Sequence, residues 1–62
     1  MDKKGRYTIT VYEDRGNTYA RMYPTDHQLI ARQPIIYYQN TTDSPDEAIE
    51  ELMTMKKIFD LL

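Results

Sequence analysis

Apolar and polar residues alternate along Arg6–Asp14, a pattern that predicts a half-buried β-strand. One face carries Tyr7, Ile9 and Val11, and the other carries Thr8, Thr10 and Tyr12. The following Asp14-Arg15-Gly16-Asn17 predicts a tight turn, because Gly16 and Asn17 tolerate positive φ. Asn17–Tyr23 is the predicted return strand.

The apolar pattern selects the register of this hairpin. A two-residue Arg15-Gly16 loop pairs Asp14 with Asn17 and places all apolar partners on one face. The pairs are then Val11 with Ala20 and Ile9 with Met22 on that face, and Tyr12 with Tyr19 and Thr8 with Tyr23 on the reverse. A slip by one residue sets Ile9 against Arg21 and breaks the pattern, so the first register is favoured.

A long connection, Pro24–Gln33, follows the hairpin, and Thr25–Gln28 is a candidate for one helical turn within it. Pro34 suits the first position of a strand or a sheet edge. Ile35-Ile36-Tyr37-Tyr38 predicts a third strand, and its apolar residues on both faces predict burial on both sides.

The last segment carries a clear helix start. Ser44-Pro45-Asp46-Glu47 is a capping box with proline at the first helical position, and we expect a helix from Pro45 to about Phe59 or beyond. Its apolar stripe is Ala48, Leu52, Met55, Phe59 and Leu62, flanked by Ile49, Met53 and the Lys56 stem, with Ile58 and Leu61 on the opposite side.

These elements predict an α+β fold in which one C-terminal helix covers one face of a three-stranded antiparallel sheet (βββα). We expect one domain over residues 1–62, with 1–5 disordered. A chain this short buries only about 60% of its unfolded surface. With no cysteine for a disulfide, oligomerisation is the remaining means of stabilising it. No apolar run approaches the ~20 residues of a membrane span.

The six tyrosines add an aromatic second face to the predicted fold, because alternation divides them between the two faces of the sheet. Tyr7 and Tyr37 fall on one face, and Tyr12, Tyr19, Tyr23 and Tyr38 fall on the other. One helix covers one face, so the second aromatic face is either an exposed surface or an interface with a second copy or another protein. We favour the interface, because Ile36 lies there too. Stacking of single-stranded bases is a further alternative.

Charge is divided unevenly along the chain. Residues 1–42 carry six basic and four acidic side chains (+2), whereas residues 43–62 carry two and six (−4). The acidic helix favours a basic protein surface as partner and argues against direct nucleic-acid binding. The predicted helix carries acidic residues at i, i+3 and i+4 spacings: Asp46, Glu47, Glu50 and Glu51. Residues at these spacings lie about 5–6 Å apart, which is close to the spacing of phosphates along a DNA strand. They form either a solvated helix face or a row that imitates phosphates.

Catalysis is not expected. With one histidine and no cysteine, no Ser-His-Asp or Cys-His arrangement is available unless His27 acts from a mobile loop, and a solvated histidine is the commoner case. Metal binding by Asp43, Asp46 and Glu47 competes with helix capping, which explains these carboxylates better. We expect no metal and no cofactor.

The order and spacing of several segments resemble the short, dimeric, phage-encoded inhibitors of uracil-DNA glycosylase. The resemblance covers about Tyr7 to Leu62. It rests on Thr8–Gly16, on Tyr19 three residues later, on Tyr38-Gln39-Asn40-Thr41 and on Asp46-Glu47-Ala48-Ile49 before a leucine terminus. These inhibitors fold as a three-stranded antiparallel sheet with one helix.

The resemblance implies a homodimer in the host-cell cytoplasm that occupies the DNA-binding groove of host uracil-DNA glycosylase by mimicking DNA. It implies a cavity between subunits for the apolar side chain that the enzyme otherwise inserts into DNA. The family's tyrosine before the helix falls on Tyr38, its hairpin tyrosine on Tyr19 and its helix carboxylate on Glu47. Pro34 and Ile35 stand where the family has Phe and Glu, and about three extra residues separate Asn40 from the helix.

We therefore expect an inhibitor that blocks uracil excision from phage DNA, without membrane or direct nucleic-acid contact. The predicted cavity and dimer residues are Ile36, Tyr37, Tyr38, Leu52 and Met55, and the predicted phosphate mimics are Asp46, Glu47, Glu50 and Glu51. The alternative is a small phage or host anti-defence or adaptor protein that binds another protein through the aromatic sheet face. A single-strand-binding module is the third reading.

Overall fold

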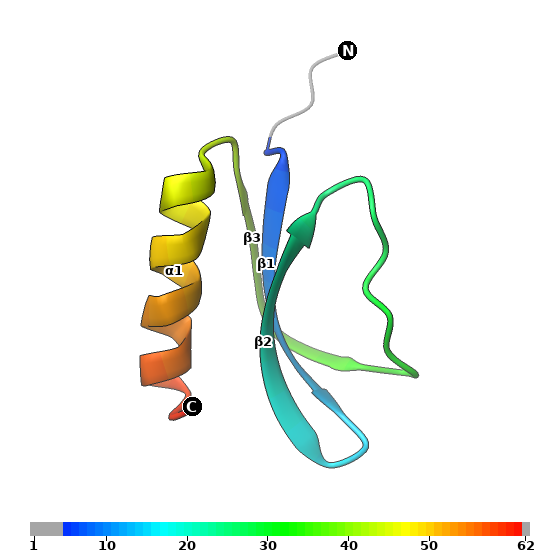
Figure 1. The fold of residues 1–62 in the computed structure, drawn as a ribbon. Helices are drawn as coiled ribbons and strands as arrows, with labels where there is room; N and C mark the ends of the chain where they lie inside the picture. Colours follow the sequence, from blue (N-terminus) through cyan, green and yellow to red (C-terminus); the bar gives the residue numbers. More distant parts are fainter. Residues whose placement is uncertain (1–4, 62) are drawn as a thin grey trace.

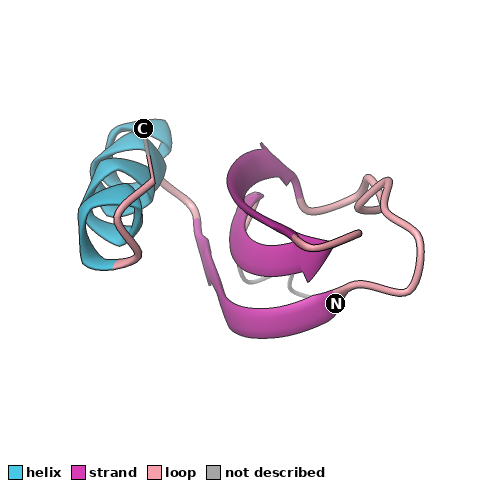
Figure 2. Ribbon diagram, turned by 90° about the horizontal axis from the view of Figure 1, so that it is seen from below, coloured by secondary structure: helices cyan, strands magenta, loops and turns pink. Residues whose placement is uncertain are grey.

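The computed structural model describes residues 5–61 and has three strands followed by one helix. Strands β1 (Tyr7–Asp14), β2 (Asn17–Pro24) and β3 (Ile35–Thr42) form one antiparallel sheet in the order β2-β1-β3. Helix α1 (Pro45–Ile58) covers one face, as Figure 1 shows, so the predicted βββα fold is confirmed. Residues 25–34, the β2–β3 connection, lie on the opposite side of the sheet from α1 (Figure 2).

The β1–β2 hairpin has the predicted register. Asp14 pairs with Asn17, Val11 with Ala20, and Tyr12 with Tyr19. The turn differs from the expectation in its backbone. Arg15 and Gly16 adopt positive φ (57° and 84°), whereas Asn17 already belongs to β2. Two consecutive positive-φ residues match the type I′ turn that follows the twist of a two-residue hairpin.

Strand β1 is the centre of the molecule, and its side chains are buried on both faces. Ile9 and Val11 are fully buried under α1 together with Ala48. On the reverse face Thr8, Thr10 and Tyr12 are also buried, although the helix does not reach them. The β2–β3 connection covers part of that face, so the surface that alternation assigned to a partner is partly occupied by the chain itself.

Strand β3 is an edge strand, and burial on both sides was a wrong prediction. Ile35, Ile36 and Tyr37 are 55, 46 and 48% exposed. A β-bulge also interrupts its pairing with β1, since Val11 pairs with Tyr38 and Tyr12 with Ile36. Tyr37 is the extra residue, so alternation reverses there. Tyr38 therefore lies on the helix side with Val11, not on the reverse face with Tyr12.

The helix begins and ends close to its predicted limits. The Ser44 Oγ accepts a hydrogen bond from the Glu47 backbone N–H at 3.2 Å, and Phe59 is the C-cap. The reciprocal half of the capping box is absent in its usual form. The Glu47 carboxylate instead accepts from Thr42 Oγ1, which in turn accepts from the Ser44 backbone N–H.

Two local expectations were wrong. Thr25–Gln28 forms no helical turn; it forms a turn closed by a hydrogen bond from the His27 N–H to the Pro24 carbonyl at 2.9 Å. Gly5 is ordered and buried, and its N–H donates to Asp43 Oδ1 at 2.9 Å. The rest of the predicted disordered segment, residues 1–4, and Leu62 lie outside the described residues.

Candidate functional site

Three glutamates lie along β3, and each accepts a hydrogen bond from a β3 side chain. Glu13 accepts from the Tyr37 hydroxyl, and Glu47 accepts from Thr42 Oγ1 at 2.9 Å. Glu51 accepts from the Tyr38 hydroxyl and from Asn40 Nδ2, the latter at 3.0 and 3.1 Å to its two oxygens. We call Glu13, Glu51 and Glu47 the β3 carboxylate row.

The spacing of this row follows from the strand. Two residues of a β-strand span about 6–7 Å, and the donors from Tyr38 to Thr42 recur at every second position on the helix side. Glu47 and Glu51 are one turn apart on α1, so they meet successive donors of this series, Thr42 for Glu47 and Asn40 for Glu51. The bulge adds Tyr37, which extends the row to Glu13 on β1. The row therefore draws on all three elements that meet at this edge.

Each of the two tyrosines at the bulge has a pKa that its glutamate partner raises. The hydrogen bond to Glu51 raises the pKa of Tyr38 above its ordinary value of 10.0, and the nearby negative charge acts in the same direction. The hydrogen bond to Glu13 likewise raises the pKa of Tyr37. Both hydroxyls therefore remain protonated donors to their glutamates at neutral pH.

Apolar side chains border the carboxylate row. Tyr37 stacks on Phe59 with ring centroids 6.2 Å apart and an interplanar angle of 23°. Ile35 and Ile58 are also exposed, at 55 and 65%. Exposed aromatic and aliphatic groups beside oriented carboxylates are typical of a surface that binds protein, where apolar contacts supply affinity and charges supply complementarity.

The residues predicted for the cavity are not gathered in one place within a single copy of the chain. Ile36 pairs with Tyr12 on the reverse face, whereas Tyr38 pairs with Val11 on the helix side. Leu52 and Met55 are half-buried in the helix stripe. The bulge explains this separation, because it reverses the side-chain alternation between Ile36 and Tyr38.

The predicted phosphate mimics divide into two pairs. Glu47 and Glu51 belong to the β3 carboxylate row, whereas Asp46 and Glu50 lie exposed on other positions of α1. Sequence reasoning missed Glu13, which comes from β1, and the donors Asn40 and Thr42. Glu13 could be found only by knowing the β-bulge, because the bulged residue Tyr37 is its donor. The register of the β1–β2 hairpin does not determine which β3 side chains approach Glu13.

Metal binding has no support among residues 5–61, where no three His, Asp or Glu side chains gather closely enough to hold an ion. Asp43 and Glu47, two of the three candidate ligands, instead bond to Gly5 and Thr42. Within the same residues, α1 is too short and too polar to cross a bilayer.

The reverse face carries an aromatic cluster of its own. Tyr12 and Tyr19 are 5.4 Å apart at 34°, and the Arg21 guanidinium lies 5.3 Å from the Tyr19 ring centroid. Beside it, Thr10 Oγ1 and the Tyr23 hydroxyl are 2.8 Å apart, and Gln39 Nε2 donates to both. These bonds satisfy polar groups on a partly covered face, where Tyr12 is buried and Tyr19 and Tyr23 are half-buried.

Comparison of the chain with protein-family models, with curated proteins and with solved structures found no match.

Proposed function

We propose that this protein inhibits uracil-DNA glycosylase by occupying the enzyme's DNA-binding groove as a mimic of DNA. The observation that carries the proposal is the β3 carboxylate row, in which Glu13, Glu51 and Glu47 each accept a hydrogen bond from a β3 side chain. A groove that binds DNA presents cations to phosphates about one nucleotide apart. Oriented carboxylates at a similar spacing are complementary to such a groove.

The segregation of charge supports the same proposal. Residues 43–61 carry Asp43, Asp46, Glu47, Glu50, Glu51 and Asp60 against Lys56 and Lys57, a net charge of −4 on the helix layer. A field of one sign on one layer accelerates association with a basic cleft. The hydrogen bonds to Tyr37 and Tyr38 reduce the entropy lost on binding, because the glutamates are already oriented.

The chain acts by binding and occlusion, without a reaction of its own, and its active form in this proposal is a homodimer. The exposed apolar residues beside the row, including Ile35, Tyr37 and Ile58, are those that a second copy would cover. The cavity for the enzyme's apolar side chain then forms between copies, since a single copy separates Ile36 from Tyr38.

The test is uracil release by a purified uracil-DNA glycosylase from uracil-containing DNA, with increasing amounts of this chain. We expect saturable inhibition that DNA competes against, and unchanged uracil release at micromolar excess would refute the proposal. The informative variant is Glu47→Gln with Glu51→Gln, which removes two charges from the row and should weaken inhibition more than tenfold, since charged pairs at such interfaces are coupled by about 1.5 kcal/mol or more.

Asp60→Asn is the matched control. It removes one carboxylate of the same layer beyond the C-terminal end of α1, and asparagine tolerates the positive φ of 59° at that position. Inhibition by this variant should stay within about threefold of the parent, because a rim charge outside the row contributes little. If the chain inhibits no glycosylase but retains a different host protein with the same dependence on Glu47 and Glu51, the adaptor alternative is favoured instead.

A further inference from the structure

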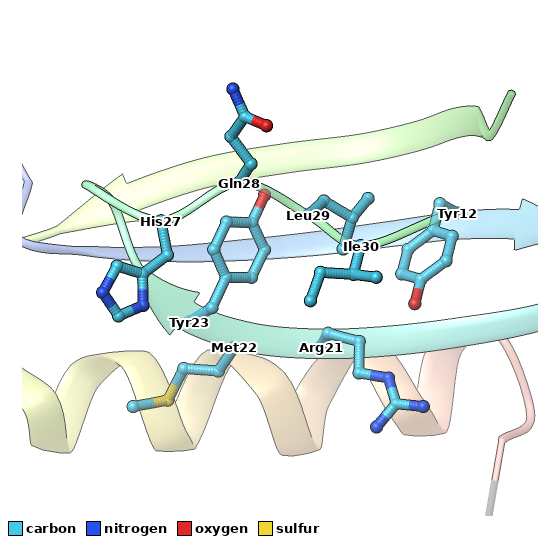
Figure 3. Close-up of a pocket in the computed structure, with 8 residues that line it drawn as sticks. All are labelled: Tyr12, Arg21, Met22, Tyr23, His27, Gln28, Leu29 and Ile30. Carbon is cyan, nitrogen blue, oxygen red and sulfur yellow. The ribbon is translucent and has the colours of Figure 1, made fainter. Parts of the chain in front are cut away.

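A hollow lies on the reverse face of the sheet, away from the β3 carboxylate row. It has a volume of about 750 Å³ and lies between β1 and β2 on one side and the β2–β3 connection on the other (Figure 3). We call it the connection pocket. Its lining residues are Tyr12, Arg21, Met22, Tyr23, His27, Gln28, Leu29 and Ile30. This volume falls in the usual range of small-molecule sites.

The middle of the connection pocket is apolar. Leu29 and Ile30 come from the connection, and the Tyr23 ring comes from β2. Ile30 is 95% exposed although it borders this hollow, so its side chain has almost no cover from the chain itself. An apolar group placed in the pocket would bury part of Ile30 and Leu29, at about 25 cal/mol per Å² of apolar surface.

One end of the pocket carries donors that suit a carboxylate. Figure 3 shows the Tyr12 hydroxyl and the Arg21 side chain at the end where Ile30 lies, and His27 at the other end. The Tyr19 ring lies against the Arg21 guanidinium and limits its movement. Arginine binds carboxylates through two parallel N–H bonds, and a phenol adds a third donor.

The charge of the pocket selects for anions. None of its eight described lining residues is an aspartate or a glutamate, whereas Arg21 is a permanent cation. The ribbon of α1 lies on the other side of the sheet from the β2–β3 connection (Figure 2), and Arg21 also lines a second hollow that includes Lys56 and Asp60. A nucleic-acid strand is less suited to the pocket, because such ligands need cations along several successive phosphates and the lining offers only Arg21 and His27.

We propose that the connection pocket binds a small carboxylic acid with an apolar body. The carboxylate accepts hydrogen bonds from Arg21 and the Tyr12 hydroxyl, and the apolar body lies against Leu29, Ile30 and the Tyr23 ring. This binding does not rest on the proposed inhibition, because the pocket shares no residue with the β3 carboxylate row.

The experiment is a titration of the isotope-labelled full chain with sodium octanoate, followed by NMR and by calorimetry. We expect saturable, one-to-one binding with shifts at the amides of Tyr23, Leu29 and Ile30. Uncharged 1-octanol and Arg21→Gln with octanoate should each show binding weaker by about tenfold, the loss expected for one charge-assisted hydrogen bond. Lys56→Gln, which removes a cation from the helix, should bind as the parent does.

Ile30→Ala provides a variant that cannot disturb the core, since the side chain is almost fully exposed, and it should weaken octanoate binding severalfold. Absence of saturable shifts with millimolar octanoate overturns the proposal. Equal binding of octanoate and octanol, or octanoate binding unaffected by Arg21→Gln, overturns it as well. Tighter binding of oligothymidylate than of octanoate at these same amides would assign the pocket to nucleic acid.

Discussion

The hydroxyl of Tyr38 on β3 donates a hydrogen bond to the carboxylate of Glu51 on α1, and Asn40 two residues later donates to both oxygens of the same carboxylate. The centre of the helix is thus tied to the edge strand by polar bonds. Burial under α1 is concentrated on β1, where Ile9 and Val11 are fully enclosed. The Tyr38–Glu51 contact therefore both positions a carboxylate and holds α1 against β3.

Tyr38→Phe should lower the free energy of unfolding by about 1 kcal/mol, because it removes one partly buried hydrogen bond and leaves the ring in place. Urea denaturation followed by circular dichroism measures the change. Tyr37→Phe is the matched comparison, and it should cost less, since Tyr37 is 48% exposed and its bond to Glu13 competes with water. An equal loss in both variants would contradict the structural role assigned to Tyr38.

The raised pKa values of Tyr37 and Tyr38 predict a stability change at alkaline pH. A tyrosine whose pKa is higher in the folded chain stabilises it fully below its ordinary value of 10.0, and this contribution disappears as the pH rises through the raised pKa. Stability should therefore fall above about pH 10. NMR titration of the ring carbons should show Tyr38 ionising above its ordinary value of 10.0, and Glu51→Gln should move its midpoint downwards.

Gly5 and Gly16 provide a matched pair of substitutions at similar backbone angles, with φ of 91° and 84°. A Cβ at Gly5 would lie 2.3 Å from the Thr41 Cβ, whereas a Cβ at Gly16 meets nothing within 4 Å. Gly16→Ala should cost about 1 kcal/mol from the backbone alone. Gly5→Ala should cost about 2–3 kcal/mol, because steric overlap adds to strain. Thermal denaturation compares them, and equal losses would argue against close packing of Gly5 on β3.

The helix cap gives a further prediction. Ser44→Ala removes the acceptor of the Glu47 N–H and should destabilise the chain by about 1 kcal/mol. Thr54→Ala is the control, because Thr54 Oγ1 only bonds back to the Glu50 carbonyl within the helix and alanine has the higher helix propensity. We expect it to be neutral or stabilising, as measured by chemical denaturation. A larger loss for Thr54→Ala than for Ser44→Ala would contradict this account of the cap.

Dimerisation can be tested separately from inhibition. Light scattering after size exclusion should give twice the mass of one chain at micromolar concentration. Tyr37→Asp should shift the equilibrium towards the monomer by placing a charge on the exposed apolar edge. The same charge at the first residue of β2, Asn17→Asp, should leave the mass unchanged. A monomer at every accessible concentration would remove the dimer from the proposed function.

Local signals were sufficient for most of the fold. The hairpin register followed from keeping Ile9 and Val11 on one face with Met22 and Ala20, and the helix start followed from Ser44 and Pro45. Each of these features is determined by residues close in sequence or by one repeating pattern. Such features are the ones that propensity and alternation describe well.

The same reasoning could not predict which face of the sheet each β3 side chain occupies. Alternation assumes an unbroken strand, and the bulge at Tyr37 depends on how β3 meets β1 across the whole sheet. The position of the β2–β3 connection could not be predicted either, because the way it covers Thr8, Thr10 and Tyr12 depends on tertiary packing. The candidate site inherited both errors: of the β3 carboxylate row only Glu47 and Glu51 were among the predicted phosphate mimics, and Ile36 was grouped with Tyr38.

The bulge also determines how this surface responds to changes in chain length. Deleting Tyr37 would make the pairing regular, with Ile36 still opposite Tyr12 on the reverse face and Tyr38 still opposite Val11 on the helix side. A single-codon deletion would therefore remove the bond to Glu13 and the stack on Phe59, while the other β3 side chains kept their faces. Length variation at this point thus adds or removes one recognition side chain without disturbing the pattern of either surface.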